Sequence, residues 1–76
     1  MADDGVQLHL NRQEALVFFE WIARVEPLGQ SVFQHPAEEK VVWTLQAQLE
    51  RTLVEPFAAD YRAIVDHARK TVDAES

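Results

Sequence analysis

The side chains that could do chemistry in this chain are three histidines, two serines and a surplus of carboxylates. No two of His9, His35 and His67 share the i, i+4 spacing with which one helix face presents a zinc-binding pair. The chain has no cysteine, which removes every thiolate ligand. The histidine at 35 precedes Pro36-Ala37-Glu38-Glu39, and we read this segment as a helix start whose carboxylates favour the positive end of the helix dipole. We therefore expect no metal site.

Catalysis by a nucleophile is not favoured either. Ser31 lies in a predicted turn and Ser76 at the end of the chain, and neither belongs to a Gly-x-Ser-x-Gly elbow. Two glycines in the whole chain do not build a loop that cradles phosphate. Most carboxylates of a short helical domain are solvated or cap a helix. We expect no enzyme, no cofactor and no small-molecule substrate; an enzyme that uses His35 with Glu38 or Glu39 is the alternative.

Length and composition predict one globular domain over residues 1–76. Hydrophobic residues make up 47% of the chain and charged residues 26%. The net charge is −6, with 13 acidic and 7 basic residues, and the basic ones are scattered between Arg12 and Lys70. Binding of nucleic acid or of an anionic membrane needs clustered cations, so both are unlikely partners on this pattern.

Hydropathy and the N-terminal residues predict a cytoplasmic protein. The longest apolar run, residues 15–19, is five residues long, far short of a membrane span. The chain starts Met-Ala-Asp-Asp, which is acidic where a signal peptide is basic. The preference for Ala, Val and Arg suggests a bacterial source.

Three helices are predicted from the 3.6-residue apolar periodicity and from the positions of Asn, Asp and Pro. Asn11 and Asp60 are suitable N-caps, Pro36 suits the first turn of a helix, and Pro56 ends the helix before it. Their predicted ranges are 12–26, 36–55 and 60–72, with flexible tails at 1–5 and 73–76.

The segment 6–10 alternates apolar and polar residues, which is typical of a short strand with Val6, Leu8 and Leu10 facing the core. An extended arm packed on the helices explains the same pattern. The fold class is thus mostly α, a compact three-helix domain preceded by one short N-terminal β-strand or extended arm. A lone strand leaves unpaired backbone groups, which pairing with a second copy about a twofold axis would satisfy.

The second helix carries two apolar stripes. Its main stripe consists of Val41, Val42, Leu45, Leu49 and Leu53. Trp43, Ala47 and Val54 form a second stripe, which indicates either a protein interface or a helix covered on both sides. Val17 and Trp21 lie off the main stripe of the first helix, and for Trp21 a half-covered core position is the favoured interpretation. The candidate interface residues are Trp43, Ala47, Val54, Val17, Trp21, Val6 and Leu8.

Three segments, 11–16, 38–43 and 53–57, resemble parts of short bacterial proteins to which no activity is assigned. This resemblance implies no activity, cofactor or functional residue.

The sequence therefore predicts a small non-enzymatic module for protein–protein interaction, an accessory or regulatory protein that binds another protein or forms a homodimer. The alternative is an acidic inhibitor, similar to an antitoxin, that masks the basic surface of its partner.

Overall fold

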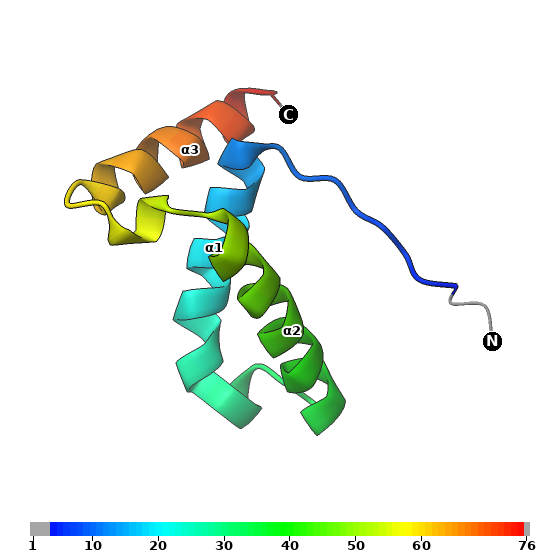
Figure 1. Ribbon diagram of the computed structural model, residues 1–76. Coiled ribbons are helices and arrows are strands. Elements are labelled where there is room, and N and C mark those ends of the chain that lie inside the picture. The colour runs from blue at the N-terminus through cyan, green and yellow to red at the C-terminus, as the bar shows by residue number, and fades with distance from the viewer. Residues whose placement is uncertain (1–3, 76) are drawn as a thin grey trace.

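The computed structural model describes residues 4–75, and the first three residues and Ser76 of the predicted tails lie outside this range. The described part consists of three α-helices and two short 3₁₀-helices. The elements are α1 (Arg12–Val25), η1 (Glu26–Ser31), α2 (Pro36–Thr52), η2 (Glu55–Phe57) and α3 (Tyr61–Glu75). α1 and α2 run in opposite directions beside each other, and α3 lies across the end of α1 where that helix begins (Figure 1). The predicted mostly α, three-helix class is confirmed.

Capping side chains fix the starts of α1 and α2. The Asn11 side chain accepts a hydrogen bond from the Glu14 N–H at 2.8 Å, and the Glu14 carboxylate accepts one from the Asn11 N–H at 2.9 Å. These reciprocal bonds satisfy two N–H groups that have no partner within the helix. At α2, His35 Nδ1 accepts from the Ala37 N–H at 2.9 Å, and Pro36 occupies the first turn. The predicted N-cap at Asn11 is confirmed.

The connection between α1 and α2 turns at Gly29. Its φ of 54° and ψ of −126° lie in a region that side-chain-bearing residues rarely adopt. Its carbonyl accepts hydrogen bonds from the N–H groups of Val32 at 3.0 Å and Phe33 at 3.1 Å. The glycine therefore allows the chain to reverse before α2 begins.

Two of the predicted helix ends were wrong. α2 ends at Thr52 and not at residue 55, because Leu53 adopts an extended conformation (ψ 132°) and places its side chain in the core, with 2% exposed. Burial of this side chain ends the helix before Pro56 can. α3 continues to Glu75, so the predicted tail is helical over 73–75, where the sequence contains no helix breaker.

The core lies mainly between α1 and α3. Its buried residues are Ala15, Leu16, Phe19, Ile22, Val25, Leu53, Val65 and Ala68. Five of them belong to α1 and two to α3, whereas no residue of α2 is buried. α2 thus packs on the rest of the molecule through half-buried side chains only.

The predicted strand is not formed. Residues 4–10 have no regular secondary structure and extend away from the start of α1 (Figure 1). Val6 and Leu8 are 84% and 81% exposed, so their predicted inward orientation was wrong. The described residues contain no other strand to pair with this segment, and its backbone groups stay solvated. It is an extended arm.

The chain as a whole, with its extended arm, has a larger surface and radius of gyration than a compact chain of its size. It exposes 6104 Å², whereas a compact chain of 8.7 kDa exposes about 4,700 Å². Its radius of gyration is 14.0 Å, where about 11 Å is typical for this length. Within residues 4–75, none of the helices combines the length and the apolar character that crossing a membrane requires.

Candidate interaction surface

The structure does not bring the histidines together. His9 lies on the arm, His35 caps α2, and His67 lies on α3, where its carbonyl accepts a hydrogen bond from the Thr71 hydroxyl at 2.9 Å. Over residues 4–75, no three His, Asp or Glu side chains form a group that could hold a metal ion. Ser31 is the last residue of η1.

One flank of α2 carries Lys40, Trp43, Ala47 and Glu50. Their spacing of three, four and three residues places them on one side of a helix that turns about 100° per residue. The Trp43 side chain is 46% exposed, Lys40 and Glu50 are exposed, and Ala47 is half-buried. We name this set the Trp43 flank; it contains Trp43 and Ala47 of the predicted second stripe, together with two charged residues.

Val54 does not belong to the Trp43 flank. The periodicity that aligned it with Trp43 and Ala47 applies only within a helix, and α2 ends two residues earlier. Val54 lies in the connection to η2 and is 69% exposed. The second stripe of the prediction is thus shorter than expected.

The opposite flank of α2 lines an apolar groove of about 550 Å³. Leu45 and Leu49 of α2 form one wall, Ala15 and Phe18 of α1 another, and the arm borders the rest. The arm residues at this groove are Val6, Gln7, Leu8 and Leu10. The sequence placed Val6 and Leu8 among the candidate interface residues, but it did not indicate that they share a groove with α2.

Val17 and Trp21 lie on a third surface, where α1 meets the end of α3. The rings of Phe18 and Trp21 stack, with centroids 6.1 Å apart and planes inclined by 12°. Trp21 is 43% exposed and lines a shallow hollow with Val17 and with Arg69 of α3. Trp21 is therefore partly covered within the chain. The seven predicted residues do not form one site: they divide among the arm, the α1–α3 hollow, the Trp43 flank and the α2–η2 connection.

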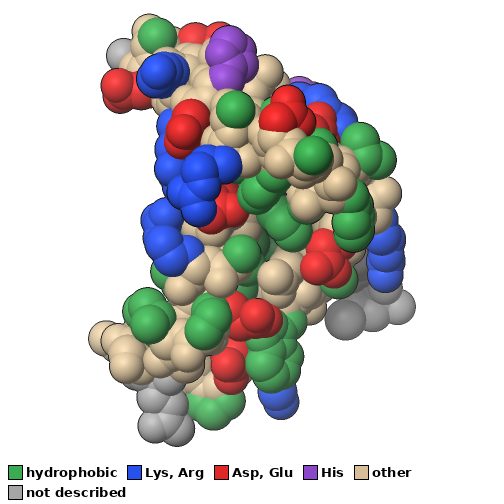
Figure 2. All heavy atoms as spheres, turned by 90° about the vertical axis from the view of Figure 1, so that its left-hand side faces the viewer, with side chains coloured by type: hydrophobic (Ala, Val, Ile, Leu, Met, Phe, Trp, Pro, Cys, Tyr) green, Lys and Arg blue, Asp and Glu red, His purple; other side chains and the backbone are tan. Residues whose placement is uncertain are grey.

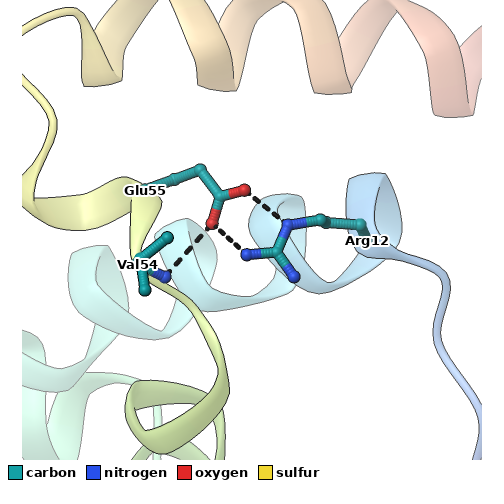
Figure 3. A network of polar contacts seen from close by, with 3 residues as sticks. All are labelled: Arg12, Val54 and Glu55. Atoms are coloured by element: carbon teal, nitrogen blue, oxygen red, sulfur yellow. Dashed lines mark hydrogen bonds and ion pairs between the residues drawn. The ribbon is translucent and has the colours of Figure 1, made fainter.

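An ion pair links the start of α1 to the connection between α2 and α3. The Arg12 guanidinium donates to both carboxylate oxygens of Glu55, from Nε at 2.5 Å and from Nη2 at 2.8 Å, and the Val54 N–H donates to the same carboxylate at 3.2 Å (Figure 3). The hydrogen bonds and the charge of Arg12 lower the pKa of Glu55, although partial burial opposes this effect. Glu55 in turn raises the pKa of Arg12. The pair fixes the point at which the chain leaves α2.

A second polar contact joins α1 to α3. The Tyr61 hydroxyl donates to Glu20 Oε1 at 2.9 Å. Burial, with the hydrogen bond and charge of Glu20, raises the pKa of Tyr61 to about 12, against a smaller opposite effect of Arg69. This contact and the core beneath it hold α3 on α1. Among the described residues, no side-chain hydrogen bond of this kind joins α2 to α1.

Charges of both signs are distributed over the surface. On the face in Figure 2, basic side chains gather along one edge with acidic ones among them, and hydrophobic side chains lie next to one another over much of the rest. The Arg69 guanidinium lies 3.5 Å from the Asp66 carboxylate on α3. No single acidic face is seen in this view.

A helix without a buried residue, an apolar groove and a half-exposed tryptophan thus lie within one small molecule. Comparison of the chain with protein-family models, with curated proteins and with solved structures gave no match.

Proposed function

We propose that this chain is a small protein-interaction module, an accessory or regulatory protein that acts by contact with another polypeptide through α2. The observation that carries the proposal is the lack of a buried residue in the 17 residues of α2. Helices in water gain most of their stability from burying an apolar face, and a helix of this length is marginal without it. A partner chain on α2 would supply the missing burial.

The size of the exposed surface supports the proposal. The molecule, with its extended arm included, exposes about 1,400 Å² more than a compact chain of its mass. A typical protein interface covers about 800 Å² on each partner. Tryptophan is the residue most enriched among those that dominate binding energy, and Trp43 is half-exposed on α2. The acidic, Ala- and Val-rich composition is in keeping with a bacterial cytoplasmic setting for this module.

The test compares three baits: the wild type, Trp43→Glu and Val41→Glu. Both variants add a carboxylate to an exposed apolar position of α2, but Val41 lies about 160° away from Trp43 around the helix. We expect binding of a partner, or of a second copy, by the wild type and Val41→Glu and its loss in Trp43→Glu. Circular dichroism verifies that all three baits are folded. If they are folded and bind the partner equally, the proposal is contradicted.

The acidic inhibitor is the second candidate, and it is based on the net charge of −6. A complex of this kind weakens steeply with ionic strength, because complementary charges drive its association. Binding centred on Trp43 includes an apolar contact that salt does not screen, so its affinity should fall less with ionic strength. Measuring partner affinity at low and moderate salt therefore separates the two candidates.

A further inference from the structure

The charge and the size of the side chains on the Trp43 flank change from one end of the helix to the other: the first is a cation and the last an anion, and a large ring precedes a small side chain. From the N-terminal end it presents a cation (Lys40), a large aromatic ring (Trp43), a small side chain (Ala47) and an anion (Glu50). Over residues 4–75, the ion pairs are Arg12–Glu55 and Arg69–Asp66, so neither Lys40 nor Glu50 has an ionic partner in this part of the chain. Both charged groups are exposed and free to pair with another molecule.

A twofold axis converts this pattern into a complementary one. When two copies of α2 lie antiparallel with their Trp43 flanks together and the axis crosses at the level of residue 45, Trp43 of each copy lies beside Ala47 of the other. Lys40 of each copy then lies beside Glu50 of the other. Alanine leaves room for the indole ring, and two Lys–Glu pairs flank the apolar centre. A C2 interface uses the same surface on both subunits, as this arrangement does.

The parallel arrangement is disfavoured by the same residues. In register, it would place Trp43 against Trp43, Lys40 against Lys40 and Glu50 against Glu50. Two like-charged pairs would then replace the two Lys–Glu pairs, and neither indole ring would lie beside an alanine. The sequence of the flank therefore specifies the direction of pairing as well as the contact.

We infer that two copies of this chain associate through the Trp43 flank as an antiparallel α2–α2 pair, with Trp43 against Ala47 and Lys40 against Glu50 across the interface. This inference rests on the proposed function and names its partner as a second copy.

The experiment measures dimer dissociation by sedimentation equilibrium for the wild type, Lys40→Glu, Glu50→Lys and an equimolar mixture of the two variants. Each single variant places like charges on both sides of the axis, and we expect its dissociation constant to rise about tenfold. In a mixed dimer, the two altered side chains face each other as one Glu–Lys pair, and the unaltered Glu50 of one chain faces the unaltered Lys40 of the other. Both ionic pairs are then complementary, and we expect heterodimers with an affinity close to that of the wild type.

Lys70→Glu is the matched control, because it makes the same charge change at an exposed position on α3. It should leave the dissociation constant unchanged. Trp43→Ala should weaken the dimer more than either charge variant, since it removes the apolar centre. All substituted side chains lie outside the core, and circular dichroism verifies that the helices remain.

Two results would overturn the inference. A wild-type chain that stays monomeric at all concentrations would show that the occupant of the flank is not a second copy; the proposed function would still stand if Trp43→Glu abolished capture of another protein. If the dimer dissociation constant is the same for the wild type, both charge variants and Trp43→Ala, the self-interface lies elsewhere on the chain.

Discussion

The guanidinium of Arg12, the first residue of α1, binds the carboxylate of Glu55 through two parallel hydrogen bonds across 43 positions of sequence. The bidentate geometry joins the N-terminal end of the first helix to the connection between the second and third. Both segments would otherwise be held only by the apolar core below them. The pair therefore has a structural role that substitution can measure.

Glu55→Gln should lower the midpoint of thermal unfolding by a few degrees at neutral pH. Since the pair lowers the pKa of Glu55 in the folded state, its contribution is present above the ordinary value of 4.5 and is lost as the pH falls through the lowered pKa. The difference between wild type and variant should thus disappear in acid. Glu50→Gln, at an exposed carboxylate that forms no ion pair among the described residues, is the control and should leave the unfolding midpoint at neutral pH unchanged in dilute, monomeric samples.

Tyr61 is the only tyrosine, so ultraviolet absorbance of the phenolate reports on it alone. We expect it to titrate at about 12 in the folded protein, because burial and Glu20 both disfavour the phenolate. A raised pKa means that the folded state holds the proton more tightly than the unfolded state, so stability should fall as the pH rises from 10 towards 12. Glu20→Gln should bring the titration closer to the ordinary value of 10. An unchanged curve in this variant would show that burial alone shifts the pKa.

Leu53 and Val54 are neighbours with opposite environments, at 2% and 69% exposure. Leu53→Ala should lower the free energy of unfolding by about 2–5 kcal/mol, since it leaves a cavity between α1 and α3. Val54→Ala should change it by less than about 0.5 kcal/mol. Urea denaturation measures both. Similar effects of the two substitutions would be inconsistent with the burial of Leu53.

The two glycines of the chain provide a matched test of backbone conformation. An alanine side chain at Gly29 would meet no atom within 4 Å, so only the backbone geometry opposes it. Gly29→Ala should destabilise the fold by about 1–3 kcal/mol. Gly5→Ala, in the exposed arm, should have no measurable effect. If both variants have the same free energy of unfolding as the wild type, the turn before α2 does not need its positive φ.

The three helices were predictable because each is encoded locally. The N-cap at Asn11 and the proline at the start of α2 act within one turn of their own positions, and the apolar periodicity between them needs no tertiary information. The end of α2 was not predictable in this way. Pro56 marks where a helix must stop, but Leu53 leaves it earlier because its side chain is buried against α1.

The candidate site was predictable in part. The half-exposed position of Trp43 follows from its angle on the helix, and the structure confirms that it is not buried. The groove beside Leu45 and Leu49 was not predicted, since it depends on how the arm and α1 lie relative to a helix that is distant in sequence. The alternation over 6–10 indicated a strand, but an alternating segment becomes a strand only where another strand can pair with it.

The uneven distribution of buried residues also has a kinetic consequence. With five buried residues in α1, two in α3 and none in α2, the helices do not share one level of local stability. In the isolated chain, α2 should open without global unfolding, and its amide hydrogens should exchange with solvent well before those of α1. Any chain that covers α2 would slow this exchange, because binding to the closed form suppresses the opening. Protection of α2 amides would thus report occupancy of the surface before the occupant is identified.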